Sequence, residues 1–293
     1  MSGWVLPILG SALMLGIYDV FKKHAVRENS VMPVLFLATL SGTVFFLLLT
    51  GVRAFFAPVS LDWSGDVLGL TFLKSLLVAA SWAFVYYGLR ELPVSIAAPL
   101  RSTAPLWSLL GAILIFHEMP LPWQWLGIFL IFTGCLLFTL IGQKENFSWH
   151  SKGFCCTMTG TLLGSASALY DKFLLGTHHI APTTLQFHFS WMLVAILGGA
   201  LLFKQLFLPA KAPFQWRWSI VATGVLLIVA DALYFYALST PDARISILSL
   251  LRRSSVVVAF AVGGGIFREK LLLPKGAALT IILAGAAILS LCK

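Results

Sequence analysis

The sequence predicts an all-α membrane protein in which ten transmembrane helices form two inverted-topology repeats of five helices around a central cavity. Three observations support this fold class. The composition is too apolar for a water-soluble protein, the chain divides into ten apolar segments of membrane-spanning length, and charged residues recur at matching places in its two halves. Together they predict that the segments are membrane helices, how many there are, and that the two halves are related by symmetry.

The composition leaves too few charged residues to cover a soluble protein of this length. Only 11% of the 293 residues are charged and 59% are hydrophobic, whereas soluble domains carry about 25% charged residues. Lipid is the solvent that accepts such a surface. The net charge of +9 lies mostly in short connectors, which suits lipid headgroups, and no nucleic-acid-binding motif is recognisable. We therefore expect membrane lipids, and no nucleic acid, as partners.

Ten apolar segments can be delimited along the chain, and each is long enough to cross a hydrocarbon core of about 30 Å as a helix. They are residues 4–21, 31–51, 67–89, 93–115, 120–142, 154–175, 182–207, 217–238, 244–266 and 273–292. Continuous apolar runs such as residues 126–132 lack the alternation of a transmembrane β-strand. The segments are therefore predicted to be helices.

Charged motifs repeat between the two halves at a separation of about 151 residues. Tyr18-Asp19 recurs as Tyr170-Asp171, Leu100-Arg101 as Leu251-Arg252, and Phe116-His117-Glu118 as Phe267-Arg268-Glu269. A duplication explains the constant spacing, with residues 1–142 as the first repeat, 143–153 as a connector and 154–293 as the second repeat. Because each repeat has an odd number of spans, the second must lie in the opposite orientation in the membrane.

The basic residues of the connectors are distributed unequally between the two sides of the membrane. Connectors that follow odd-numbered spans hold most of the lysines and arginines, including Lys22, Lys23 and Lys275. The positive-inside rule places these connectors in the cytoplasm. Both termini are therefore predicted to lie on the same side, outside the cytoplasm.

The ten-span pattern resembles the EamA-type transporters of the drug/metabolite transporter superfamily. The resemblance rests on the two five-span halves, on an aspartate near the end of each first span, and on the repeated Phe-x-Glu motif that ends in Glu118 and Glu269. Glycine also recurs in the last span of each half, at Gly134 and Gly285. The resemblance covers essentially the whole chain. It implies a substrate cavity surrounded by spans one, three, four, six, eight and nine, a bacterial inner-membrane location, and cytoplasmic termini, in contrast to the charge count.

Ionisable residues inside apolar segments are costly and usually face a cavity or a partner. Arg101 and Arg252 lie about seven residues into their spans, where the side chain cannot easily reach the membrane surface. Arginine suits a phosphate or a carboxylate because its planar fork donates two parallel hydrogen bonds. Asp19 and Asp171 would orient these arginines, exchange a proton, or lie at the interface near their span ends. The structural alternative is that Asp19–Arg101 and Asp171–Arg252 are ion pairs that lock each half.

Three further ionisable residues break the symmetry of the repeats. Arg253, Lys74 and Asp231 have no charged equivalent in the other half, so we expect them to bind substrate and to discriminate between substrates. Tyr86 and Tyr234, on the third and eighth spans, offer aromatic faces for a ring or a quaternary amine. A lipid-facing position is the alternative for these tyrosines.

Pro99 and Pro105 flank Arg101 in the fourth span, and proline weakens a helix because it removes a backbone hydrogen bond. The ninth span carries Leu250 and Val256 at the equivalent places, so the two halves are expected to bend differently. The predicted coupling or gating set is Asp19, Asp171, Tyr18, Tyr170, Pro99 and Pro105.

The sequence contains no phosphate-binding loop, no metal-ligand cluster and no nucleophile motif. We therefore expect no cofactor, no metal and no catalytic residue. The leading hypothesis is secondary-active transport of a small anionic or zwitterionic metabolite by alternating access, coupled to a proton or a counter-substrate, in a monomer or homodimer. Flipping of a phosphate-headed lipid is the close alternative. A membrane-embedded enzyme, which would need an acid–base pair such as His188 with an aspartate, is the alternative of a different class.

Overall fold

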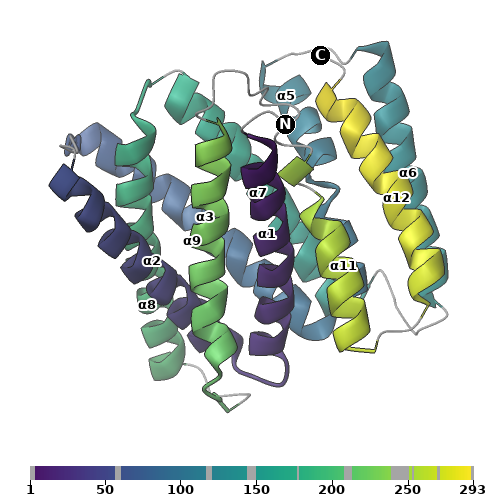
Figure 1. The fold of residues 1–293 in the computed structure, drawn as a ribbon, viewed down its shortest axis with the longest axis horizontal. Helices are drawn as coiled ribbons and strands as arrows, with labels where there is room; N and C mark the ends of the chain where they lie inside the picture. The colour runs from purple at the N-terminus through teal and green to yellow at the C-terminus, as the bar shows by residue number, and fades with distance from the viewer. Residues whose placement is uncertain are drawn as a thin grey trace.

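The described part of the chain is helical and contains no strand, which confirms the predicted all-α class (Figure 1). The computed structural model describes residues 4–56, 61–116, 121–143, 150–176, 178–207, 213–238, 251–252, 254–268 and 271–291. The helices are α1 (Val5–Val26), α2 (Val31–Phe56), α3 (Gly65–Glu91), α4 (Val94–Arg101), α5 (Ala104–Phe116), α6 (Pro122–Gln143), α7 (Lys152–Gly176), α8 (Pro182–Phe207), α9 (Trp218–Leu238), α11 (Ser255–Ile266) and α12 (Leu272–Leu291).

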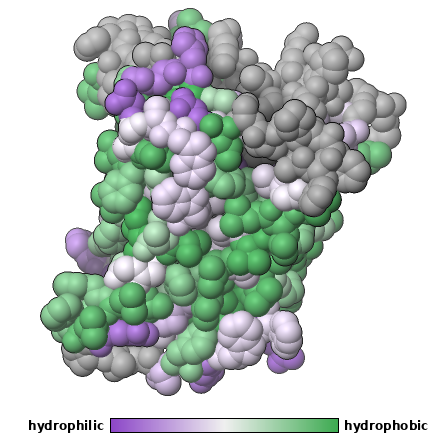
Figure 2. All heavy atoms as spheres, turned by 90° about the vertical axis from the view of Figure 1, so that its left-hand side faces the viewer, coloured by the Kyte–Doolittle hydropathy of each residue, from purple (hydrophilic) through white to green (hydrophobic). Residues whose placement is uncertain are grey.

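Within the described residues, α1, α2, α3 and α8 are long and apolar enough to cross a membrane. Figure 2 shows a broad hydrophobic band between hydrophilic residues toward the upper and lower ends of one face. Exposed tryptophans lie beside the first residues of α3, α6 and α9, at Trp63, Trp123, Trp125, Trp216 and Trp218. Because tryptophan prefers the membrane–water interface, these positions mark the ends of the spans, and the protein is a multi-pass membrane protein.

The three most extensive helix–helix contacts among the described residues each join the first half of the chain to the second. The helix α1 packs against α9, α3 packs against α7, and α6 packs against α12. The α6–α12 pair lies at one edge of the bundle, whereas α1 lies near its centre (Figure 1). The first turn of α1 and the last turn of α12 lie at the same end of the bundle.

Glycine allows these pairs to approach closely. A methyl group at Gly134 of α6 would lie 3.0 Å from the backbone oxygen of Ala278, and one at Gly285 of α12 would lie 2.6 Å from the backbone oxygen of Gly127. Small residues of this kind hold membrane helices together because they bring backbones into van der Waals contact. The contact is reciprocal, since each of the two repeated glycines faces the partner helix.

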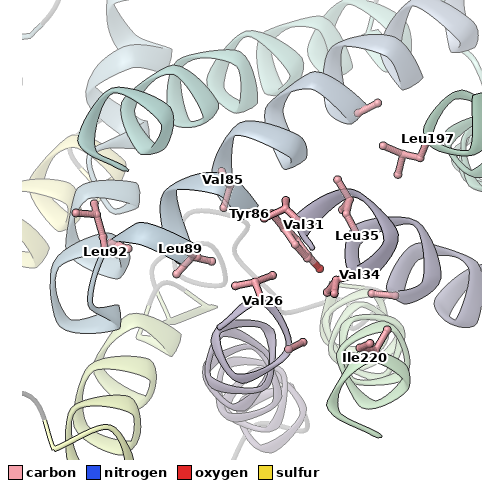
Figure 3. Close-up of a cluster of buried hydrophobic side chains, with 14 of the residues drawn as sticks. Val26, Val31, Val34, Leu35, Val85, Tyr86, Leu89, Leu92, Leu197 and Ile220 are labelled. Atoms are coloured by element: carbon pink, nitrogen blue, oxygen red, sulfur yellow. The ribbon is translucent and has the colours of Figure 1, made fainter. Parts of the chain in front are cut away.

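The largest cluster of buried apolar side chains lies between α1, α2, α3, α8 and α9 (Figure 3). Val26, Leu35, Leu89 and Ile220 are among its members. Beside it, the Nζ of the buried Lys23 donates hydrogen bonds to the backbone oxygens of Leu89 and Leu92, both at 2.6 Å. A lysine that satisfies the last carbonyls of a helix stabilises its C-terminus, so Lys23 ties α1 to the end of α3.

The fourth span is interrupted between α4 and α5, directly after Arg101. Thr103 donates its backbone N–H to the carbonyl oxygen of Leu100 at 3.2 Å and its hydroxyl to the same oxygen at 2.7 Å. Such local bonds compete with the hydrogen bonds of a continuous helix. Pro99 lies inside α4, and Pro105 is the second residue of α5, so the interruption lies between the two prolines.

The second half has the same interruption without a proline. Residues 251–252 are helical, Ser254 lies in a turn, and α11 begins at the next residue. Ser254 donates its N–H to the carbonyl oxygen of Leu251 at 3.1 Å and its hydroxyl to the same oxygen at 2.6 Å. The expectation that the two halves bend differently stays a prediction, but a hydroxyl turn follows the arginine at the equivalent place in both spans.

Candidate substrate-binding site

Asp19 lies at the centre of a buried charge cluster on α1. Its Oδ1 accepts hydrogen bonds from the Nζ of Lys22 at 2.5 Å and from the Nη1 of Arg101 at 2.7 Å. The side chain of Lys22 is 1% exposed, and its Nζ lies 4.2 Å from the ring centroid of Tyr18. The Asp19–Arg101 pair is therefore present, but it shares its carboxylate with a second cation.

The aspartate and the arginine of the second half do not pair with each other. Asp171 binds Lys74 of α3, and Arg252 binds Asp231 of α9. The predicted Asp171–Arg252 pair is therefore wrong. Helix packing explains the difference, because α7 packs along α3, which carries Lys74, while α9 carries an aspartate that the first half lacks.

Arg101 and Arg252 line one pocket with a volume of about 300 Å³, here named the arginine pocket. Its other lining residues are Leu15, Asp19, Ala98, Ser102, Tyr234, Ser255 and Val256. The two helix interruptions bring the arginines together from opposite halves of the chain. The guanidinium of Arg252 also lies 4.4 Å from the ring centroid of Tyr234, which fits a cation–π contact.

One donor in the arginine pocket lacks an acceptor. The Nε of Arg252 is buried and has no hydrogen-bond partner among the described residues, although another nitrogen of the same group binds Asp231. A buried donor without an acceptor costs about 1–3 kcal/mol. Among the described residues around this pocket, Lys22, Arg101 and Arg252 outnumber the carboxylates of Asp19 and Asp231 by one formal charge, so the site is chemically suited to an anion.

A second pocket, here named the hydroxyl pocket, lies between α2, α3, α8 and α9 and has a volume of about 120 Å³. Its polar lining residues are Thr39, Thr43, Gln186, Ser190, Thr223 and Asp231, its aromatic ones are Tyr18, Trp82, Tyr86 and Phe189, and Ala38, Gly42, Leu193, Gly224, Leu227 and Ile228 complete it. Tyr86 is 3% exposed, which places its ring inside the protein. Asp231 connects the two pockets, since its carboxylate binds Arg252.

Tyr170, Lys74, Asp171 and Pro99 are not among the residues that line either pocket. Tyr170 donates its hydroxyl to the backbone oxygen of Leu70 at 3.3 Å. Lys74, which binds Asp171, lies 5.2 Å from the ring centroid of Phe189. Arg253 lies outside the described residues.

His188 does not form the acid–base pair that an enzyme would require. It is buried, and its Nε2 lies 2.8 Å from the backbone oxygen of Asp62. Trp191 donates its Nε1–H to the Nδ1 of the same ring at 3.3 Å. Both ring nitrogens therefore contact groups that are not carboxylates.

Two lysines that sequence reasoning assigned to connectors lie inside the protein. Lys22 follows Asp19 by one helical turn, and this spacing alone indicates that the two side chains meet. Lys275 is fully buried, and its Nζ donates to the Oγ of Ser95 at 3.2 Å. Its helix α12 shows no local signal for that contact, so Lys275 could not have been placed from the sequence. Lys23 is buried as well.

The first half of the chain matches a known protein family. Residues 2–140 match the EamA-like transporter family. This half of the protein belongs to that family. The resemblance to EamA-type transporters is thereby confirmed, and it indicates a membrane transporter rather than an enzyme.

Curated relatives add a more specific similarity over a shorter stretch. The chain is 39% identical over 70 residues to probable 4-amino-4-deoxy-L-arabinose-phosphoundecaprenol flippase subunits ArnE of Salmonella paratyphi A and Salmonella typhi. The match covers 24% of this chain and 60% of each relative. A solved crystal structure also matches 96% of this chain and 94% of its own, with a TM-score of 0.64 and 16% identity; that likeness concerns the fold alone.

Proposed function

We propose that this EamA-type protein is a secondary-active transporter that moves a small anionic or zwitterionic substrate by alternating access. The observation that carries the proposal is the arginine pocket, where Arg101 and Arg252 meet and where no described residue offers an acceptor to the buried Nε of Arg252. Arginine binds phosphate and carboxylate through parallel hydrogen bonds. The surplus of one positive charge suits a substrate group with one negative charge, because a bound anion leaves the buried site neutral.

The packing supports two repeats of opposite orientation, residues 1–142 and 154–293, joined by residues 143–153. Exchange of the two halves turns the α1–α9 pair into the α7–α3 pair and leaves α6–α12 unchanged. The hydroxyl turns after the two arginines and the reciprocal contacts of Gly134 and Gly285 follow the same exchange. Repeats of this kind are a common frame for alternating access about a site at their interface.

Exchange of ion-pair partners supplies the proposed link between binding and movement. When an anion takes the hydrogen bonds of Arg252, Asp231 is released to bind a proton or a cationic group. Asp19 and Lys22 play the corresponding part beside Arg101. Coupling to a proton or to a counter-substrate follows from this exchange, and we assign the remaining gating roles to Asp171, Tyr18, Tyr170, Pro99 and Pro105.

A phosphate-headed lipid is the second candidate substrate. The relatives named above are called flippase subunits for a phosphoundecaprenol-linked aminosugar, and a phosphodiester carries the single negative charge that the arginine pocket would neutralise. The same two arginines would hold the headgroup while the lipid tail stays in the bilayer. In this case a second copy or another subunit is the expected partner. Either substrate fits a bacterial inner membrane, with both termini on one side.

Transport in proteoliposomes tests the proposal and distinguishes the two sources of phosphate. One arm measures uptake of a soluble sugar phosphate, and the other measures the transfer of a polyprenyl-phosphate-linked sugar between leaflets. Arg101→Gln and Arg252→Gln should each reduce the active arm at least tenfold, since each removes a charge-assisted hydrogen bond. Arg27→Gln is the control, because Arg27 is exposed and pairs only with the neighbouring Glu28 among the described residues.

Normal transport by both folded arginine variants would remove the anion site from consideration. Conversion of the probe into a chemically new product, detected by mass spectrometry, would favour the membrane-embedded enzyme.

A further inference from the structure

We propose that the hydroxyl pocket is a second substrate subsite that binds a ring rich in hydrogen-bond donors, namely the sugar of a sugar phosphate. This inference rests on the proposed function, which places the phosphate in the arginine pocket. The two pockets adjoin at Asp231, which lines the hydroxyl pocket and binds Arg252 of the arginine pocket. A single ligand can therefore occupy both.

The hydroxyl groups of this pocket are arranged as acceptors. Each threonine or serine hydroxyl has one hydrogen to donate and two lone pairs that accept. Their hydrogens are already donated to backbone oxygens: Thr39 to Leu35 at 2.8 Å, Thr43 to Ser190 at 3.3 Å, Ser190 to Gln186 at 2.7 Å and Thr223 to Ser219 at 2.6 Å. The oxygens therefore remain available as acceptors, and they complement a ligand that brings its own donors.

Aromatic rings form the apolar part of the pocket. Trp82, Tyr86 and Phe189 lie among the lining residues, and Tyr18 joins them from α1. Ligand pockets commonly combine such apolar walls with a few placed polar groups. A sugar ring matches both parts, because its C–H faces pack on aromatic rings while its hydroxyls point at the acceptors. An acyl chain brings no donors, and it would leave the acceptor oxygens unsatisfied.

Asp231 adds a charge-exchange step between the pockets. The phosphate replaces Asp231 on Arg252, and a hydroxyl or amino group of the ring then donates to the released carboxylate. The bound phosphate compensates the surplus positive charge of the arginine pocket, and the released carboxylate gains a donor, which limits the desolvation cost of loading the site. An amino group makes the exchange complete, since it brings a positive charge to Asp231.

Calorimetric binding to the full chain in lipid nanodiscs tests the subsite. The probes are inorganic phosphate, glucose 1-phosphate and a polyprenyl-phosphate-linked glucose placed in the nanodisc. We expect at least one of the two glucose-bearing probes to bind, and to bind at least tenfold more tightly than inorganic phosphate. Thr39→Val and Thr223→Val should each weaken that probe about three- to tenfold, as expected for one neutral hydrogen bond, and leave inorganic phosphate unchanged.

Thr50→Val is the matched control. Thr50 lies on α2, as Thr39 does, and donates its hydroxyl to the backbone oxygen four residues earlier at 2.9 Å, but it lines neither pocket. Binding of phosphate without a glucose preference, or a glucose preference that survives both valine substitutions, would overturn the subsite and leave the anion site standing. If inorganic phosphate and both glucose probes fail to bind, the proposed function fails and the subsite fails with it.

Discussion

Arg101 and Arg252 occupy equivalent places in the two halves, yet different partners hold them. Each arginine follows a leucine whose carbonyl oxygen accepts a hydrogen bond from the hydroxyl of a threonine or serine three residues later. Both arginines therefore lie in the same kind of turn. Arg101 shares Asp19 with the buried Lys22, whereas Arg252 binds Asp231 and its Nε has no acceptor among the described residues. The duplicated motif therefore determines where each guanidinium lies, whereas residues that are not repeated determine how its positive charge is compensated.

Removal of one carboxylate at a time, Asp19 or Asp231, should give the largest difference in stability between the two halves. Asp19→Ala leaves the buried Lys22 and the half-buried Arg101 together without their carboxylate, and we expect the free energy of unfolding to fall by about 3–5 kcal/mol. Asp231→Ala leaves one cation and should cost about half as much. Thermal unfolding followed by tryptophan fluorescence in detergent measures both. Equal losses would show that Lys22 does not add to the charge that Asp19 compensates.

Glycine substitution in α6 and α12 tests whether the halves are equivalent where no charge is involved. Gly134→Ala and Gly285→Ala each push a methyl group into the partner backbone, at 3.0 and 2.6 Å from the nearest backbone oxygens. Overpacking of this kind costs about 1–3 kcal/mol, so both variants should lose similar thermal stability. A loss confined to one variant would contradict the reciprocal contact.

Lys22 and Lys23 are neighbours with different expected roles. Lys22→Met removes the surplus charge beside the arginine pocket, and we expect a monoanionic substrate to bind about tenfold more weakly, or about 1.4 kcal/mol. Lys23→Met removes the cap of α3 and should lower the melting temperature while leaving affinity unchanged. The pair is measured by titration calorimetry together with thermal unfolding, and an affinity loss in Lys23→Met alone would reverse the assignment.

Substitutions in the two hydroxyl turns, at Thr103 and Ser254, should give the smallest difference in stability between the halves. Ser254→Ala removes one side-chain hydrogen bond to the preceding leucine carbonyl, which is worth about 1 kcal/mol. Thr103→Val removes the equivalent bond and also the acceptor of the Trp107 Nε1–H at 3.2 Å, so we expect a small loss of thermal stability from Ser254→Ala and a somewhat larger one from Thr103→Val. Transport should fall in parallel, because each turn positions the arginine two residues before it.

Features with a local or periodic signal could be predicted from the sequence. The helical class follows from the apolar segments, and the Asp19–Arg101 pair follows from charges that recur in both halves. Lys22 carries a usable signal in its spacing from Asp19. The partners of Asp171 and Arg252 could not be predicted, because opposite charge does not reveal which helices pack together. The hydroxyl pocket could not be predicted either, because its acceptor hydroxyls lie on three separate helices, α2, α8 and α9, and such serines and threonines are common in membrane helices.

The claim that the two halves build one anion site is tested most directly by measuring the stoichiometry and affinity of inorganic phosphate binding to the full chain in nanodiscs. We predict one phosphate per chain, and Arg101→Gln and Arg252→Gln should each weaken that same event about 10- to 100-fold, while Arg27→Gln has no effect. Two separate binding events, each lost with only one arginine, or unchanged binding in both variants, would contradict the claim that the two halves build one anion site.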